Sequence, residues 1–231
     1  MPPGLQAGNK QLREQHKIIK TVLAHFLIMR PARHFGIFGE NQFAYTRGRG
    51  ARDAIAFLIM AWLFNFAGGK KIALYCSDVA GAFDRVDKNR LLCKLRVAGL
   101  HPKLVLVIES WLRDRSAEVV VGGAKSSFIS MCNMVYQGTV LGPMLWNIFF
   151  RDAGEVIRGM CFQDIVYADD LNAFQFYPKH VNANYLMQDM RGVQKNLLFG
   201  GEKRTVKGLT REKNRSIFDF KQNCMVEIAN Y

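Results

Sequence analysis

Hydrophobic and polar positions follow two different periods along the chain, and this predicts a mixture of helices and strands. Residues 11–30 carry apolar side chains at roughly helical spacing with basic residues on the outer face, and we expect Pro31 to stop this helix. Five further helices are predicted, at about Asp53 to Phe66 before Gly68-Gly69, Asp87 to Leu95 before Gly99, Pro102 to Leu112, Pro143 to Ile157 and Ala183 to Leu198.

Apolar runs between these helices predict strands. Residues 70–79 are apolar with little alternation, which is typical of a strand covered on both faces. Two strands, at 117–121 and 128–134, are expected to join through Gly122-Gly123, and residues 164–176 predict a strand, a turn and a second strand. Helices combined with a mostly antiparallel sheet give an α+β fold.

The turn between the last two strands carries two adjacent carboxylates, Asp169 and Asp170, after Tyr167-Ala168. Such a pair is on its own also an ordinary polar turn. The strand at 70–79 presents another carboxylate near its end, Asp78, which is soon followed by the aromatic Phe83. Acidic residues at strand ends are therefore the first candidates for chemistry.

Composition and charge narrow the class of protein. With 231 residues, 49% of them hydrophobic and 12% aromatic, the chain can bury a sizeable core. A formal net charge of +13 and an isoelectric point near 9.7 favour a polyanionic partner such as nucleic acid, with an acidic membrane surface as the competing interpretation. The apolar stretches 55–67 and 18–29 are too short or too interrupted to span a membrane.

The first residues lack the basic start and continuous apolar core of a signal peptide, so we expect an intracellular protein that is not secreted. The five cysteines are odd in number and widely spaced, which predicts no disulfide partner and no zinc site. We interpret them as small buried hydrophobes, at Cys76, Cys93, Cys132, Cys161 and Cys224.

Three motifs occur in a characteristic order: Asp78 with Ala82-Phe83, then Gln137-Gly138, then Tyr167 to Asp170. The surrounding words SDVAGAFDRVD, YQGTVLGPMLWNIFF and VYADDLNAF resemble the catalytic blocks of reverse transcriptases from non-LTR (LINE-type) retrotransposons. GENQFAYTRGRGARDAIAFL is similar to their finger-side block. The resemblance runs from about Gly39 to Phe176, and more weakly to Phe218.

This resemblance implies a polymerase right-hand palm, an antiparallel sheet packed on helices, with partial fingers. It assigns residues 1–70 to fingers, 71–199 to palm, and 200–231 to a basic tail that begins a palm/thumb connection. Since no thumb is expected within the chain, it resembles a truncated copy. Two departures from the family are Tyr136, where proline often precedes Gln-Gly, and residues 9–19, where no Arg-Pro-Ile/Leu block is recognisable.

The implied activity is RNA-directed DNA polymerisation, in which dNTPs are added to a DNA primer 3′-hydroxyl on an RNA template. Members of the family use two Mg²⁺ ions, with Mn²⁺ as a substitute, and hard cations of this kind prefer oxygen ligands. By resemblance, Asp78 and Asp169 bridge the metals, Asp170 completes the site, and the Val79 carbonyl is a further ligand. Only a sheet that places the Asp78 strand beside the hairpin can bring these residues together.

The resemblance also implies a nucleotide pocket. Phe83, with Ala82 beside it, would stack under the sugar and exclude a 2′-hydroxyl, although a core aromatic is the alternative interpretation. Gln137 and Gly138 would line the pocket, although a plain turn before a helix is the alternative. Asp84 is more typical of a solvated acid, and Asp87 and Asp164 of structural residues.

Basic residues are candidates for contacts with nucleic acid. Arg47, Arg49 and Arg52 lie in a glycine-flanked segment that could bind template phosphates or the triphosphate, or could be a solvated loop. Lys213 approximates the family's position for a proton donor to pyrophosphate. Residues 203–221 form a second basic stretch, for which a poorly ordered tail is the alternative.

Two other functions remain open. The chain could be a catalytically silent, nucleic-acid-binding remnant of a reverse transcriptase, or an RNA-dependent RNA polymerase. Phe83 argues against the second, because rNTP users need room for the 2′-hydroxyl. A nuclear location rests on the resemblance alone, and nothing indicates a protein partner.

Overall fold

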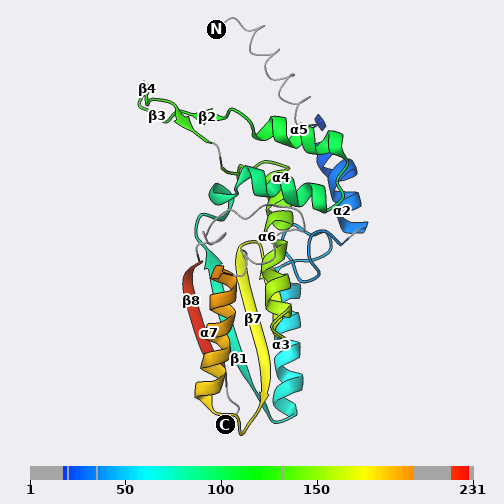
Figure 1. Ribbon diagram of the computed structural model, residues 1–231, viewed down its shortest axis with the longest axis vertical. Coiled ribbons are helices and arrows are strands. Elements are labelled where there is room, and N and C mark those ends of the chain that lie inside the picture. The colour runs from blue at the N-terminus through cyan, green and yellow to red at the C-terminus, as the bar shows by residue number, and fades with distance from the viewer. Residues whose placement is uncertain (1–17, 20, 35, 132, 200–219, 229–231) are drawn as a thin grey trace, which may run out of the picture. The chain divides into compact units, whose positions relative to one another are not determined.

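The computed structural model describes residues 18–19, 21–34, 36–131, 133–199 and 220–228 (Figure 1). Its central feature is a four-stranded antiparallel sheet in the order β6-β7-β1-β8. The strands are β1 (Lys70–Val79), β6 (Gln163–Tyr167), β7 (Asp170–Pro178) and β8 (Phe220–Ile228). Because β1 and β7 are the two inner strands, their ends lie side by side at the middle of the sheet.

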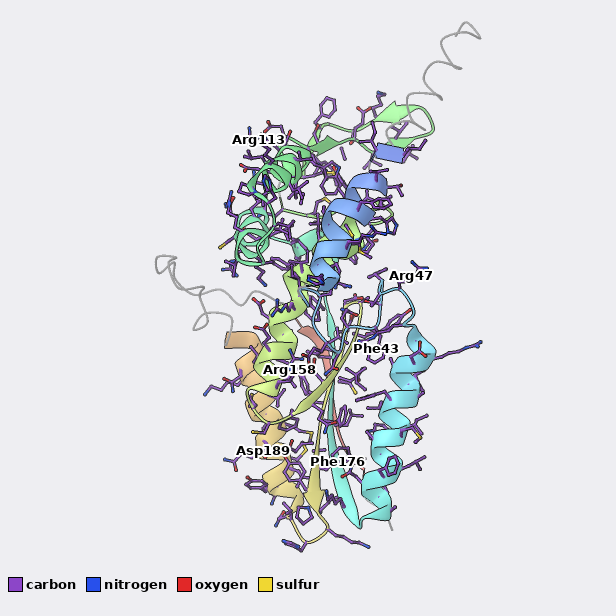
Figure 2. All side chains as sticks on the ribbon, turned by 90° about the vertical axis from the view of Figure 1, so that its right-hand side faces the viewer. Phe43, Arg47, Arg113, Arg158, Phe176 and Asp189 are labelled. Carbon is purple, nitrogen blue, oxygen red and sulfur yellow. The ribbon has the colours of Figure 1, made fainter. Side chains whose placement is uncertain are left out.

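Helices cover both faces of this sheet. Figure 2 shows α3 (Ala51–Ala67) on one side of the strands and α7 (Ala183–Phe199) on the other. Four consecutive residues of β1, Ile72 to Tyr75, are buried, as expected for a strand packed on both faces. On the α3 side, Ile72 and Leu74 form a core cluster with Phe43, Ile165 and Phe174.

The five helices predicted after Pro31 are confirmed, with bounds that differ from the predicted ones by at most two residues. Asp87 caps α4 (Lys88–Val97), because its carboxylate accepts the Arg90 N–H at 2.8 Å. Pro102 is the first residue of α5 (Pro102–Leu112), where its missing N–H costs nothing. The helix α6 extends over Gly142–Arg158. No helix in the described part of the chain is long and apolar enough to cross a membrane.

The prediction that Pro31 stops the first helix is wrong. The chain forms a π-helix, η1, over Leu23–Met29 and continues as α2 (Arg30–His34) through the proline. In the wider π-helical turn the Arg30 N–H bonds to the carbonyl of His25, and Pro31 then lies in the first turn of α2, where a missing donor is tolerated. Residues 11–17 of the predicted helix lie outside the described residues.

The predicted apolar face of that helix is also incorrect. Ala24, Ile28 and Met29 are buried, whereas the side chains expected inside are exposed at Ile18, Ile19, Val22 and Phe26. Within Leu23–Met29 the π-helical geometry has more residues per turn than the α-helical spacing on which the prediction relied, and this changes which of its positions share a face. Ile18, Ile19 and Val22 precede this segment.

The two predicted strands around Gly122-Gly123 are shorter than expected. The structure has two small ribbons, β3 (Val120–Val121) with β4 (Ala124–Lys125), and β2 (Ser116–Ala117) with β5 (Ile129–Ser130). The two glycines form the turn, both with positive φ. Val121, Phe128 and Ile129 are exposed, so these ribbons lack a buried hydrophobic face that would stabilise longer strands.

The structure corrects two further expectations, one about the C-terminal tail and one about the burial of Cys161. The tail contains β8, which pairs with β1 from Ile72 to Val79 and was not predicted. Cys161 is exposed rather than buried, because it occupies a left-handed position (φ 65°) where the chain turns after α6. Cys76 and Cys93 are partly buried.

The described chain divides into two compact units. One contains the residues up to Phe38 together with Val86–Ile148, and the other contains Gly39–Arg85 and the residues from Phe149 onward. The sheet, α3, α7 and the acidic hairpin all belong to the second unit. The Gln137-Gly138 loop and the ribbons belong to the first.

A partly buried ion pair holds β6 to the end of α6. Arg158, labelled in Figure 2, donates from one nitrogen to both carboxylate oxygens of Asp164, at 2.8 and 2.9 Å. Asn41 donates to the same carboxylate at 2.9 Å, and the Asp164 side chain is only 2% exposed. The structural role expected for Asp164 is thus confirmed. A Cβ added at Gly154 would lie 2.5 Å from an Asp164 oxygen, so this glycine makes room for the pair.

We therefore predict that Gly154→Ala destabilises the fold, although glycine to alanine inside a helix normally stabilises it by up to about 1 kcal/mol. Displacing the Asp164 carboxylate from its partners should cost roughly 2 kcal/mol or more in free energy of unfolding, measured by urea denaturation. The control is Gly192→Ala in α7, whose new Cβ would meet only the flexible end of Met160, at 3.4 Å. Equal effects of the two substitutions would contradict this packing.

Candidate functional site

The acidic pair lies at the tip of the β6–β7 hairpin, as predicted. Tyr167 pairs with Asp170 at the end of the ladder, so Ala168 and Asp169 form a two-residue turn. The φ of Ala168 is 58°, in the left-handed region, and Asp169 keeps a negative φ. This pattern is typical of a type II′ hairpin turn, which usually has glycine at its first central position. Alanine there is strained and needs support.

The register of β1 against β7 brings the third carboxylate to this tip. Ser77 is paired with Leu171, so Asp78 follows directly beside Asp170. The pairing of β1 with β8 shifts between Asp78 and Val79, and an irregularity of this kind bends a strand and redirects its side chains. The structure thus brings together Asp78, Asp169 and Asp170, which the sequence singled out. Val79 follows as a buried residue at the end of β1.

The three carboxylates influence one another electrostatically. Partial burial raises the pKa of Asp169, and the charge of Asp78 raises it further against an opposing backbone hydrogen bond. The pKa of Asp170 is raised by partial burial and by the charges of Asp169 and Asp78, although this side chain keeps an exposed surface. Repulsion between like charges near one point is relieved by a bound cation.

By chemistry and charge, this donor set fits a hard divalent cation, since all three side chains offer carboxylate oxygens. The arrangement of the side chains, however, is not that of a formed metal site. Among the described residues, no group of three or more His, Cys, Asp or Glu side chains is arranged to hold a metal ion. Asp78 is thus close enough to Asp169 and Asp170 for its charge to raise the pKa values of both, although the three side chains do not form a closed cluster.

A pocket of about 470 Å³ opens beside the carboxylates, between the sheet and α3. Asp78 and Asp170 contribute its acidic wall, and Ala54 and Leu58 of α3 contribute its apolar wall. Ser77 and Tyr167 also line it. The carboxylates therefore border a hollow with one charged side and one apolar side.

Phe83 lies in the short 3-10 helix η2 (Ala82–Arg85) directly after β1, and both Ala82 and Phe83 are buried. The ring of Tyr45 meets Phe83 edge-on, with ring centroids 6.5 Å apart. Partial burial raises the pKa of the Tyr45 phenol, and the charges of Asp169 and Tyr167 add to this. Tyr45 therefore lies near both Phe83 and Asp169.

Sequence reasoning did not select Tyr45. It is 48% exposed and has a φ of 57°, which is unusual for an aromatic residue. The only sequence feature that could have pointed to Tyr45 was its position within the finger-side block. Asp84 is exposed, as expected.

Gln42 is the second residue that sequence reasoning missed. It is only 5% exposed, and its side-chain amide bonds to both backbone groups of Ala168 in the hairpin turn. Nothing in the residues around Gln42 distinguished it from an ordinary polar loop residue.

The Gln137-Gly138 loop belongs to the first unit. Both residues are exposed, and Gly138 has a φ of 74°. The Thr139 hydroxyl links the loop to the start of α6, because it donates to the Tyr136 carbonyl at 2.8 Å and accepts the Gly142 N–H at 3.1 Å. Arg115 stacks on Tyr136 at 4.3 Å and on Trp111 at 3.9 Å from the ring centroids.

The basic candidates differ in their surroundings. Arg47, on the loop before α3 in Figure 2, and Arg52 are exposed. Arg49 donates to the Glu40 carbonyl and lies 5.3 Å from the centre of the Phe43 ring, so it helps to hold its own loop. Lys213 lies outside the described residues.

Comparison with known proteins places these observations in context. The profile of the family described as "Reverse transcriptase (RNA-dependent DNA polymerase)" matches residues 7–204. The RNA-directed DNA polymerase from mobile element jockey of Drosophila melanogaster is 43% identical over 75 residues, covering 32% of this chain and 8% of the relative. The Pol polyprotein from the type-1 retrotransposable element R2 of Popillia japonica is 29% identical over 113 residues, covering 45% and 19%.

Solved structures of telomerase share the fold. The telomerase of Candida albicans, in complex with a fragment of telomeric RNA, has a TM-score of 0.66 and 10% identity, covering 98% of this chain and 38% of that one. The apo telomerase of Candida tropicalis has a TM-score of 0.58 over 91% of this chain. At this identity the likeness concerns the fold alone, and it confirms the predicted α+β polymerase palm. The chain spans less than a fifth of the length of the jockey and R2 relatives.

We predict that Asp169→Asn raises the melting temperature at pH 7 without divalent cations. Because the pKa of Asp169 is raised in the fold, its ionised form destabilises the protein. This penalty is absent below the ordinary aspartate pKa of about 4 and complete above the raised value, so the gain should vanish as the pH falls toward 4.

The matched control is Asp84→Asn, which removes the same charge from an exposed position and should change the melting temperature little at either pH. If Asp169→Asn melts at or below the wild-type temperature at pH 7, the electrostatic coupling of the three carboxylates is wrong.

Proposed function

Because the chain belongs to the family of reverse transcriptases, the RNA-dependent DNA polymerases, we propose that its hairpin carboxylates serve RNA-directed DNA synthesis. The observation that carries this proposal is the meeting of Asp78, Asp169 and Asp170 at one end of the sheet, where partial burial and the charge of Asp78 raise the pKa values of Asp169 and Asp170. The substrates would be dNTPs, an RNA template and a DNA primer, as the names of the jockey relatives suggest.

Two Mg²⁺ ions, or Mn²⁺ in their place, would activate the primer 3′-hydroxyl and neutralise the charge of the pyrophosphate leaving group. Asp78 and Asp169 would hold both ions, with Asp170 and the Val79 carbonyl completing the ligands. Bound cations would counteract the partial burial and the charge repulsion that raise the pKa values of Asp169 and Asp170, so these pKa values should fall when the ions bind.

Phe83 and Tyr45 would together shape the place of the nucleotide sugar. Phe83 is buried and fixed by its position directly after β1, with Ala82 beside it, and Tyr45 closes on its edge. The buried Phe83 ring would leave little room for a 2′-hydroxyl, and this ring has no polar atom with which a 2′-hydroxyl could form a hydrogen bond. This favours dNTPs over rNTPs and disfavours the RNA polymerase alternative.

The remaining candidates would bind the nucleic acid and the base. Gln137 and Gly138 are proposed to line the nucleotide pocket, where a glycine with positive φ allows close approach of the backbone. The exposed Arg47 and Arg52 are proposed to contact phosphates, in agreement with the net charge of +13. Arg49 and Lys213 are also proposed to contact the nucleic acid. A nuclear place of action rests on the resemblance alone.

A catalytically silent, RNA-binding remnant is the second candidate function. It is favoured by one observation, namely that the described acidic side chains are not arranged as a closed metal-binding cluster. In that case the basic surface would still bind RNA while the carboxylates would have no catalytic use.

Primer extension separates the two functions. The 231-residue chain is expected to incorporate dNTPs on an RNA template with a DNA primer, only when Mg²⁺ or Mn²⁺ is present. Asp169→Ala should lower the rate by about a thousandfold or more, since several kcal/mol of charge stabilisation are lost. RNA binding, measured by fluorescence anisotropy, should stay the same, because the substituted residue is not part of the basic surface. RNA binding without incorporation by the wild-type chain would favour the silent remnant.

Phe83→Val is expected to relax sugar selection. The smaller side chain leaves space for a 2′-hydroxyl, so the ratio of rNTP to dNTP incorporation should rise about tenfold or more. Phe174→Val is a suitable control, because it shortens a buried aromatic in the same unit, within the core cluster. If both variants keep the wild-type ratio of rNTP to dNTP incorporation, Phe83 is a core aromatic and not a sugar filter.

A further inference from the structure

The turn that carries Asp169 requires an external support. Ala168 adopts a φ of 58° in a two-residue turn, a position at which a Cβ is strained. The residue is also 9% exposed, so its backbone N–H and carbonyl have little access to water. Both groups therefore need partners from elsewhere in the protein.

Gln42 supplies these partners. Its side-chain oxygen accepts the Ala168 N–H at 3.1 Å, and its side-chain nitrogen donates to the Ala168 carbonyl at 3.2 Å. The same oxygen accepts the Ala44 N–H at 3.0 Å. Two N–H donors point at this oxygen. Rotating the amide by 180° would place its NH2 group opposite these donors, where no hydrogen bond can form. The orientation of Gln42 is thus fixed by the backbone on both sides.

The backbone around Gln42 is equally fixed to the hairpin. The Phe43 N–H bonds to the Val166 carbonyl and the Val166 N–H bonds to the Asn41 carbonyl, each at 2.9 Å. Gln42 is thereby paired in parallel with Val166, which lies two residues before Ala168. The segment 41–44 acts as a short additional strand along β6, from which the Gln42 side chain reaches the turn.

We infer that Gln42 is a positioning residue, whose amide holds the peptide groups of Ala168 and so fixes the direction of the Asp169 and Asp170 carboxylates. It touches neither the nucleotide nor the metals of the proposed function, on which this inference rests. Its action passes through the turn, because the Ala168 carbonyl belongs to the peptide bond that leads directly into Asp169.

Few other side chains could serve. The site needs one acceptor for two N–H groups and one donor for a carbonyl at the same time, which a glutamine amide provides. Glutamate of the same length lacks the donor and would bury a charge, methionine has the length without the polar atoms, and asparagine is one methylene shorter. The role is therefore specific to the amide and not to the volume of the side chain.

The first test uses amide hydrogen exchange, read by NMR on the ¹⁵N-labelled 231-residue chain. In the wild type the Ala168 N–H should be protected, and Gln42→Met should accelerate its exchange by about tenfold or more relative to neighbouring β7 amides. The control is Asn41→Ala, which removes the bond to Asp164 from the same segment and should leave Ala168 protected. Unchanged exchange at Ala168 in Gln42→Met, or equal acceleration in Asn41→Ala, would overturn the inference.

The second test measures function. For a chain that extends primers, Gln42→Met should lower kcat by about tenfold to a hundredfold, as expected for misdirected carboxylates, with the KM for dNTP within about twofold of wild type. Adding Ala168→Gly, which removes the Cβ strain, should restore part of the loss. A general loss of folding would instead lower kcat equally in Asn41→Ala, and the double variant would show no rescue. If the wild-type chain extends no primer, the proposed function fails while amide exchange still decides the role of Gln42.

Discussion

The antiparallel register of β1 against β7 is the constraint on which the whole site depends. Pairing of Ser77 with Leu171 sets Asp78 beside Asp170, although the two residues come from distant parts of the sequence. A slip of one residue would turn Asp78 to the opposite face and separate the carboxylates. The register is in turn fixed by burial on both faces of β1, because Ile72 and Leu74 must enter the core against α3 while Ala73 and Tyr75 face the other side.

The same region shows how stability and function oppose each other. Partial burial and the charge of Asp78 raise the pKa values of Asp169 and Asp170, and Ala168 in the turn between β6 and β7 adopts a left-handed backbone conformation. Each feature costs free energy, and the neighbouring structure offsets it. The Gln42 amide supports the turn, and the Asp164–Arg158 pair secures the start of β6 to α6. A cation would relieve the remaining repulsion.

Much of this arrangement could be predicted from residues alone. The acidic hairpin, the doubly covered strand and the caps at Asp87 and Pro102 follow from short-range rules of periodicity, turn chemistry and capping, and the structure confirms them. The predictions that were wrong concern features that short-range sequence patterns do not determine. The π-helix before Pro31 changed which side chains are buried, and β8 is a strand only because the edge of β1 is available to it.

The residues that reasoning missed share one property. Gln42 and Tyr45 lie three residues apart in a loop without periodicity. Each interacts with the hairpin turn more than a hundred positions away, Gln42 through hydrogen bonds to Ala168 and Tyr45 through the charge of Asp169. Short-range sequence patterns do not predict contacts between residues that are far apart in the chain. Asp78 was found because it stands near the end of an apolar strand and because its spacing to Phe83 resembles a known motif, and its position beside the hairpin then followed from the sheet.

The central claim is that Asp78, Asp169 and Asp170 form one site for divalent cations despite their separation in sequence. Titration of Mn²⁺ into the full chain, followed by electron paramagnetic resonance, tests it most directly when wild type is compared with Asp78→Asn. The account predicts that the wild-type chain binds Mn²⁺ and that this single change on β1 weakens binding by about tenfold or more, because one shared ligand is lost. Equal binding by Asp78→Asn and wild type would contradict a common site.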